Sequence, residues 1–251
     1  MAFVQAVLVL ACVLAVTTGE VKVAVIGKAF SFPIQRADFF NGTSLLETVP
    51  VEFSPSLIGY PDLPSWLTFV QRNLTEDGYI YGTPNSYTDS NYNLEILAVN
   101  KNNYQTSRHE VTVSVKPNSN LISYLVLLQI KNFNVEDFYK KQHVRRVENI
   151  MRDIWPSGSV YITKVSSLVD EGARKPIPKS QGEKIPKEGI LVQVGGTRDF
   201  STPLRQTKIE IESCRHDNDP PVTIEANFPG YNIDWCRYEM REQPGVIGSM
   251  I

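Results

Sequence analysis

Alternating apolar and polar residues dominate the first half of the chain. Residues 21–25, 94–98 and 111–115 each place an apolar side chain at every second position. A period of two is that of a β-strand with one buried face, and polar turn clusters such as residues 83–86 separate the runs. Short strands joined by polar turns, without a helical stretch, predict a β-sandwich over residues 20–117.

The pattern changes after a polar linker at residues 117–120. The predicted elements are an almost continuously apolar strand at residues 121–130, a helix capped by Asn134 with an apolar face of Val144, Val147, Met151 and Ile154, and strands at residues 159–165 and 190–194. A run that is apolar on both faces is typical of a central strand. Strand, helix, strand and strand predict an α+β domain over residues 121–240, for which a ferredoxin-like arrangement is one candidate. Residues 241–251 are left as a tail or juxtamembrane segment.

The tryptophan in Asp62-Leu63-Pro64-Ser65-Trp66-Leu67 admits two interpretations. It could anchor the core, because a tryptophan between the two sheets of a sandwich buries on the order of 200 Å². It could instead be an exposed aromatic residue that binds a ligand. The core anchor is the favoured interpretation.

The amino-terminal segment is typical of export. Residues 1–19 carry no charged side chain, and the apolar run at residues 6–16 is too short to span a bilayer but fits the centre of a signal peptide. Cleavage is expected before Glu20. A buried first strand is the alternative. Beyond this segment no stretch of 18 consecutive apolar residues occurs, so the sequence predicts no transmembrane helix within the chain.

The cysteines and two sequons fit the same compartment. Cys12 would leave with the signal peptide, and the remaining pair, Cys214 and Cys236, predicts a disulfide in an oxidising environment. Asn41 and Asn73 each begin an Asn-x-Thr sequon among turn-forming residues and are candidate glycosylation sites.

Signals for chemistry are weak throughout the sequence. A net charge of −2, from 25 basic and 27 acidic residues, gives no electrostatic case for binding nucleic acid. The three histidines are scattered, and no known motif for metal binding, nucleophilic catalysis or phosphate binding is present. The linker lacks the clustered carboxylates that calcium needs. We therefore expect no catalytic residue, cofactor or metal. The basic stretch at residues 174–187 is either a solvated loop, which is favoured, or a site for acidic glycan.

Several motifs together resemble a known family. They are Tyr60-Pro61-Asp62-Leu63-Pro64-Ser65-Trp66-Leu67, Gln71-Arg72, Tyr79-Ile80-Tyr81-Gly82 and, near the end, Asp234-Trp235-Cys236. The first half resembles the dystroglycan type of cadherin-like domain, and the set is similar to the ectodomain of alpha- and epsilon-sarcoglycan. That family carries four cysteines in this region. Here Pro203 stands where one is expected, and a second is missing before Phe228. The resemblance implies that the two missing cysteines pair with each other, which leaves Cys214 with Cys236.

The resemblance also implies a function. It suggests a non-enzymatic extracellular subunit of the sarcoglycan complex within the dystrophin–glycoprotein complex, which links the cytoskeleton to the extracellular matrix at the sarcolemma. The implied partners are other sarcoglycan subunits and dystroglycan-associated proteins. Because the family has one transmembrane helix, membrane association is expected through a segment missing from this chain or through partners; without them the chain would be secreted. The alternative is a secreted module that binds glycan or matrix through the basic stretch.

Overall fold

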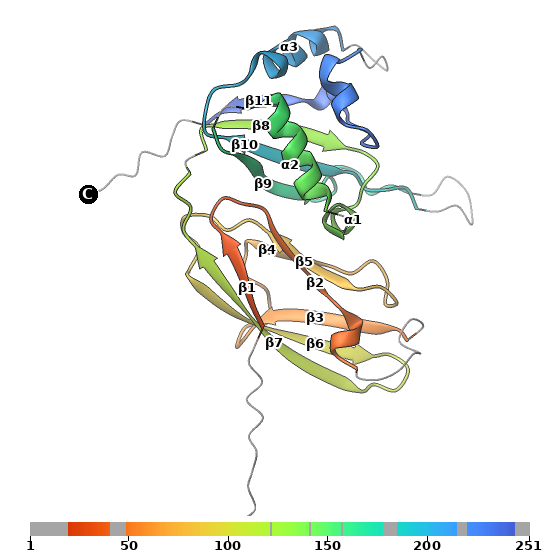
Figure 1. Ribbon diagram of the computed structural model, residues 1–251. Coiled ribbons are helices and arrows are strands. Elements are labelled where there is room, and N and C mark those ends of the chain that lie inside the picture. The colour runs from red at the N-terminus through yellow and green to blue at the C-terminus, as the bar shows by residue number, and fades with distance from the viewer. Residues whose placement is uncertain are drawn as a thin grey trace, which may run out of the picture.

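The chain folds into two domains that lie one above the other (Figure 1). The computed structural model describes residues 20–40, 49–120, 122–140, 142–156, 158–177, 185–214 and 220–243. The predicted signal segment at residues 1–19 and the sequon residue Asn41 lie outside these ranges. The N-domain comprises strands β1 to β7, and the C-domain comprises the elements from β8 to β11.

Two facing sheets form the N-domain. The first sheet has the order β1 (Glu20–Val25), β7 (Thr106–Lys116), β6 (Asn91–Asn100) and β3 (Val51–Leu57), and the second has the order β2 (Phe30–Ile34), β5 (Gly78–Gly82) and β4 (Leu67–Val70). A 3₁₀ turn, η1 (Arg36–Asp38), follows β2. The apolar residues that face each other include Phe32, Phe53, Ile80, Leu94, Ile96, Val111 and Val113. The predicted β-sandwich is confirmed.

Strand β1 orients its valines against the expectation from its period. Val21 and Val23 are 60% and 57% exposed, whereas Ala24 is buried. The reason is the register with β7, which runs parallel to β1 and pairs Ala24 with Val115 on the inner face. Because side chains alternate between faces, this register turns the neighbouring valines outward.

The C-domain has one sheet and three α-helices. In chain order it contains β8 (Tyr124–Ile130), α1 (Val135–Lys140), α2 (His143–Ile154), β9 (Val160–Ser167), β10 (Ile190–Gly196), α3 (Thr202–Glu210), the 3₁₀ turns η2 (Ile211–Ser213), η3 (Thr223–Asn227) and η4 (Trp235–Arg237), and β11 (Glu239–Glu242). The sheet order is β11-β8-β10-β9, and every pair is antiparallel. This is the βαββαβ order of a ferredoxin-like domain, so the α+β prediction is confirmed.

The single helix predicted after Asn134 is in fact two helices. Gln142 lies between α1 and α2 with a left-handed φ of 57°, which ends one helix and starts the next. Val147, Met151 and Ile154 of α2 are buried, as their spacing predicts. The side chain of Asn134 accepts a hydrogen bond from the backbone N–H of Glu188 at 2.9 Å. Asn134 therefore ties the start of α1 to the segment before β10.

Two tryptophans fill the core of the C-domain. Trp155 and Trp235 are almost completely buried, and Nε1 of Trp155 donates to the carbonyl of Asp199 at 2.8 Å. A Cβ atom on Gly196 would lie 2.2 Å from the Trp155 ring, so only glycine fits at this end of β10. None of the helices in the described ranges is both long and apolar enough to cross a membrane.

Gly82 offers a direct test of the N-domain packing. A Cβ atom at this position would lie 1.9 Å from the carbonyl oxygen of Trp66, which is backbone and cannot move aside. We expect Gly82→Ala to lower the free energy of unfolding by about 3 kcal/mol, the upper range for overpacking. The measurement is urea unfolding.

Gly59→Ala is the matched control, because nothing lies within 4 Å of its added Cβ atom. Its φ of 83° is left-handed, which costs alanine about 1 kcal/mol. Equal losses for the two variants would contradict the crowding at Gly82.

Candidate functional site at the interface of the two domains

The two domains are joined by hydrogen bonds along strand β9. The backbone N–H of Ala29 donates to the carbonyl of Ile162 at 3.0 Å, and Oγ1 of Thr83 donates to the carbonyl of Thr163 at 2.7 Å. Tyr81 of β5 is buried within the apolar cluster of the C-domain. The N-domain therefore contributes a side chain to the apolar cluster of its neighbour.

Arg72 holds two carboxylates of the C-domain. It follows β4, and its Nε lies 2.9 Å from Oε1 of Glu136, at the start of α1. Its Nη1 and Nη2 lie 2.6 Å and 2.9 Å from the two carboxylate oxygens of Glu188. Nη2 also reaches the second oxygen of Glu136 at 3.3 Å. The planar guanidinium thus binds both carboxylates through paired donors, a geometry that lysine cannot reproduce.

The charges of this cluster depend on one another. Glu136 is only 5% exposed, and a buried carboxylate is tolerated only with a partner of opposite charge. Hydrogen bonds from Arg72 hold the pKa of Glu188 below its ordinary value, against the opposing effect of burial. Burial alone would lower the pKa of Arg72, but the hydrogen bonds with Glu188 and Glu136 outweigh it and raise that pKa. Both shifts favour the charged forms of Arg72 and Glu188.

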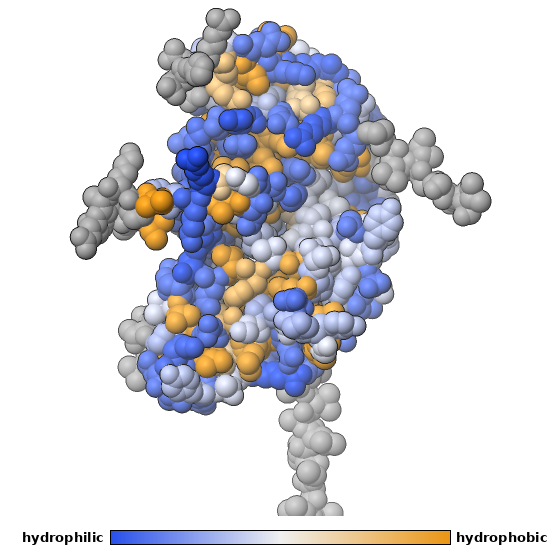
Figure 2. All heavy atoms as spheres, turned by 180° about the vertical axis from the view of Figure 1, so that it is seen from behind, coloured by the Kyte–Doolittle hydropathy of each residue, from blue (hydrophilic) through white to orange (hydrophobic). Residues whose placement is uncertain are grey.

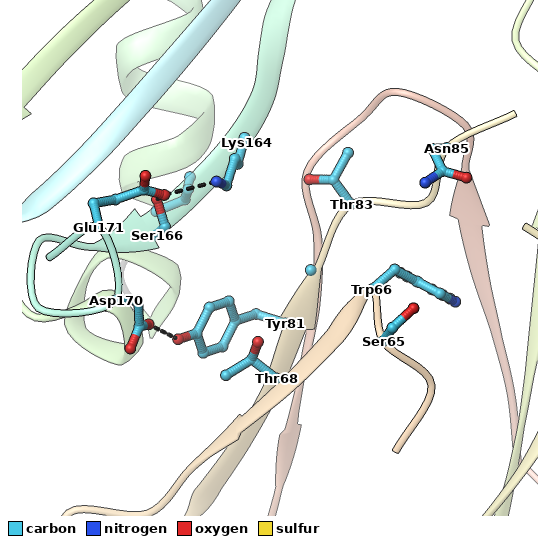
Figure 3. Close-up of a pocket in the computed structure, with 12 residues that line it drawn as sticks. Ser65, Trp66, Thr68, Tyr81, Thr83, Asn85, Lys164, Ser166, Asp170 and Glu171 are labelled. Carbon is cyan, nitrogen blue, oxygen red and sulfur yellow. Dashed lines mark hydrogen bonds and ion pairs between the residues drawn. The ribbon is translucent and has the colours of Figure 1, made fainter. Parts of the chain in front are cut away.

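A cleft of about 490 Å³ opens between the domains (Figure 3). It is lined by Ser65, Trp66, Thr68, Tyr81, Gly82, Thr83 and Asn85 from the N-domain and by Lys164, Val165, Ser166, Asp170 and Glu171 from the C-domain. In Figure 3 the Tyr81 ring points across the cleft toward Asp170. The cleft is therefore built by both domains and exists only while they keep this orientation.

The polar groups of the cleft are paired with one another. The Tyr81 hydroxyl donates to Asp170 at 3.1 Å, and burial together with that carboxylate raises the pKa of Tyr81. Lys164 and Ser166 both donate to Glu171, at 2.6 Å and 2.7 Å, which lowers the pKa of the Glu171 carboxyl. Polar groups that are paired with one another across and within the walls of the cleft suit a joint between domains.

Trp66 lies at the rim of the N-domain core and is only partly buried. Its ring packs against Phe30 and Tyr92, with centroids 6.0 Å and 5.8 Å away. Its Nε1 is enclosed, has no hydrogen-bond partner within the described part of the chain, and points away from Asp170 and Glu171 in Figure 3. Trp66 therefore packs against the core of the sandwich and also borders the cleft.

The other predicted site residues lie apart from the cleft. Cys214 and Cys236 form a disulfide with a Cα–Cα distance of 5.7 Å, which links the end of η2 to η4. Asn73 is exposed in the turn after Arg72, and its Oδ1 accepts hydrogen bonds from the N–H and the hydroxyl of Thr75. Asn41 lies outside the described ranges.

Sequence reasoning missed the residues of the interface. Arg72 was noted only as part of a motif, and Glu136 and Glu188 were not singled out. Arg72 is separated from Glu136 by 64 residues and from Glu188 by 116. No local periodicity encodes such a pairing. The family motif was the one available sign that Gln71 and Arg72 matter. Gln71 also has a structural role, because its side-chain amide donates to the carbonyl of Val51 at 2.8 Å.

Comparisons with known proteins match both domains. A family model described as the sarcoglycan alpha/epsilon N-terminal domain matches residues 21–115, and one described as the sarcoglycan alpha/epsilon second domain matches residues 121–242. The epsilon-sarcoglycans of Mus musculus and Homo sapiens are each 29% identical over 205 residues, covering 80% of this chain and 46% of theirs. The alpha-sarcoglycan of Homo sapiens is 24% identical over 218 residues, covering 84% of this chain and 55% of its own. The chain thus spans about half the length of the relatives it matches.

Removing the cation of the interface tests its role in stability. We expect Arg72→Met to lower the free energy of unfolding by roughly 3 kcal/mol at pH 7, because two carboxylates would lose their partner. Since the folded pKa of Glu188 is depressed, its contribution is present above the ordinary value of 4.5 and is lost as the pH falls through the folded pKa. The difference in the free energy of unfolding between wild type and variant should therefore shrink as the pH falls. The measurement is urea unfolding between pH 7 and pH 3.

Arg205→Met is the matched control, because Arg205 pairs with Asp199 at an exposed site and carries little stability. If Arg72→Met loses as little unfolding free energy as the control, or if its loss does not depend on pH, the interpretation of the Arg72 ion-pair cluster is refuted.

Proposed function

Because this chain belongs to the alpha/epsilon-sarcoglycan family, we propose that it is a non-enzymatic extracellular subunit of a sarcoglycan complex within the dystrophin–glycoprotein complex. The observation that carries the proposal is the match of two family models, in the right order, to both domains. The inferred partners are other sarcoglycan subunits and dystroglycan-associated proteins. Contacts with these proteins would connect the cytoskeleton to the extracellular matrix.

The interface between the domains supports this mechanical role. A subunit that works through protein contacts must keep its surfaces in a fixed relation. Arg72 and the Tyr81 side chain in the apolar cluster of the C-domain hold the two domains in one orientation. The paired polar groups of the cleft add to this joint rather than to a reactive centre.

Several features support an extracellular location. The signal-like segment at residues 1–19, the Cys214–Cys236 disulfide and the two sequons all fit the secretory pathway. The proposed place is the outer face of the plasma membrane, of the sarcolemma in muscle. Attachment would come from a segment beyond residue 251 or from the partner subunits.

Assembly in cells tests the proposal. A tagged form of the chain is co-expressed with other sarcoglycan subunits in muscle-type cells, and complexes are purified from detergent extracts of the cell surface. We expect the subunits to co-purify with the tagged chain. A chain that is released alone into the medium, and that binds a sulfated-glycan column, would contradict the proposal and favour the secreted glycan-binding alternative.

Glycosylation of Asn73 is a separate expectation of the same proposal. Asn73 is exposed in a turn, so the acceptor amide is accessible. We expect Asn73→Gln to remove one glycan from the chain recovered from the cell surface, seen as a gel-mobility step that glycosidase treatment abolishes in wild type. Asn103→Gln, an exposed asparagine without a sequon, is the control. Identical mobility of wild type and Asn73→Gln would refute this assignment.

A further inference from the structure

The pairing of polar groups in the cleft leaves part of its hydrogen-bonding capacity unused. On the C-domain wall, Oδ2 of Asp170 accepts from the Tyr81 hydroxyl, and Oε1 of Glu171 accepts from both Lys164 and Ser166. The second oxygen of each carboxylate has no hydrogen-bond partner among the described residues. Both side chains belong to exposed residues, and an ionised carboxylate accepts up to about four hydrogen bonds. This wall therefore offers acceptors to a ligand.

The N-domain wall offers the complementary groups. Ser65 and Thr68 are exposed, and neither hydroxyl is paired within the part of the chain that the structure describes. The Oδ1 atom of Asn85 accepts from the backbone N–H of Tyr87 at 2.9 Å, which leaves the amide nitrogen of Asn85 as a donor. Figure 3 shows these side chains on the side of the cleft opposite the two carboxylates. A ligand in the cleft would thus meet acceptors on one side and donors and hydroxyls on the other.

Little apolar surface is available in the same cleft. Among its lining residues the aliphatic side chain is that of Val165, which is buried, and the aromatic rings are those of Trp66 and Tyr81. On the face seen in Figure 2, the surface where the two domains meet carries many pale residues of intermediate hydropathy. Sites for drug-like ligands are lined mainly by apolar side chains, and a peptide would also need such surface for its own apolar groups. The lining instead suits a ligand that is polar over most of its surface.

The charges of the cleft restrict the ligand further. Lys164 contributes one positive charge, whereas Asp170 and Glu171 contribute two negative charges. The excess negative charge disfavours an anionic ligand, and the ammonium group in the same wall disfavours a cation. No group of three side chains that could hold a metal ion occurs within the described ranges. A neutral ligand is therefore the best electrostatic match.

A neutral sugar combines these properties. Each sugar hydroxyl both donates and accepts a hydrogen bond, so the same ring can donate to the carboxylates and accept from the opposite wall. The partly exposed Trp66 ring adds an apolar surface for the C–H groups of a sugar. The volume of about 490 Å³ lies within the usual range for small-ligand sites, which is wide enough for an oligosaccharide of a few residues.

We propose that the cleft between the domains binds a neutral oligosaccharide, which donates hydrogen bonds to Asp170 and Glu171 and accepts them from Asn85 and Thr68. The site is distinct from the basic stretch at residues 174–187 and selects against acidic glycans. The inference goes beyond the proposed function, because binding of a sugar is a property of the folded chain alone.

Binding to the purified chain is the first test. Titration calorimetry uses mannotriose, N-acetyllactosamine and chitotriose as neutral probes, and sialylated and sulfated N-acetyllactosamine as anionic ones. We expect at least one neutral probe to bind with a Kd below about 1 mM, and the anionic probes to bind about tenfold or more weakly than that one. If no neutral probe binds, or if an anionic probe binds more tightly, the proposal is overturned.

Asp170→Asn tests the acceptor wall. Asparagine keeps an oxygen that can accept from the Tyr81 hydroxyl, so the joint between the domains is retained while the charge is lost. Because hydrogen bonds to a charged group are the stronger ones, we expect the affinity for the neutral probe to fall by about tenfold. Asp153→Asn, which changes an exposed carboxylate of the C-domain outside the cleft, is the matched control and should bind as wild type does.

Thr68→Val tests the opposite wall. Valine has nearly the same shape and suits strand β4, but it lacks the hydroxyl. We expect an affinity about fivefold weaker, the effect of one neutral hydrogen bond. Thr106→Val is the control, because Thr106 is an exposed threonine at the start of β7 that does not line the cleft. Thermal unfolding verifies that all four variants are folded. Wild-type affinity in both Asp170→Asn and Thr68→Val would place the sugar elsewhere and refute the proposal.

This proposal and the proposed function can fail separately. If the purified chain binds no sugar, and Asp170→Asn and Thr68→Val recover fewer sarcoglycan subunits from muscle-type cells than wild type does, a protein partner occupies the cleft and the sugar proposal fails. If wild type binds a neutral probe in the cleft but recovers no partner subunit, the proposed function falls and the sugar proposal stands.

Discussion

One guanidinium, that of Arg72, lies between two carboxylates of the other domain, and the fixed relation of the two domains depends on that contact. Glu136 is buried and would be costly without the cation. The Glu188 carboxylate also accepts a hydrogen bond from the hydroxyl of Ser167, and the Glu188 backbone N–H donates to the side chain of Asn134. A single side chain of the N-domain thereby fixes the start of α1, the end of β9 and the entry to β10. The cleft beside Tyr81 is a consequence of the same docking, since each domain supplies one wall.

The geometry of the interface supports the proposed role, in which shape rather than reactivity matters. Hydrogen bonds between Arg72 and its carboxylate partners raise the pKa of Arg72 and lower that of Glu188 against the effect of burial, whereas burial and the Asp170 carboxylate raise the pKa of Tyr81. Family membership and the rigid joint both support the proposal of a subunit whose surfaces keep a constant arrangement.

The sequence predicted what local periodicity encodes. The β-sandwich, the α+β domain and the buried face of α2 all follow from spacing between neighbouring residues. The sequence-based predictions failed where the position of a side chain depends on a residue far away in the sequence. The outward valines of β1 depend on a parallel register with β7. Arg72 belongs to a family motif, but its ion-pair partners, Glu136 and Glu188, lie far along the chain. The disulfide between Cys214 and Cys236 was foreseeable because the sequence after the proposed signal segment contains only these two cysteines.

The most direct test of the rigid joint is a distance distribution between the two domains. Spin labels are attached at Leu97 of β6 and Ile209 of α3, which are exposed positions in separate domains, and their separation is measured by pulsed electron resonance. The account predicts one narrow distance for the otherwise wild-type chain and a broad distribution when Arg72→Met is added. A broad distribution with Arg72 present, or a narrow one that persists without it, would contradict the claim that this arginine fixes the domains.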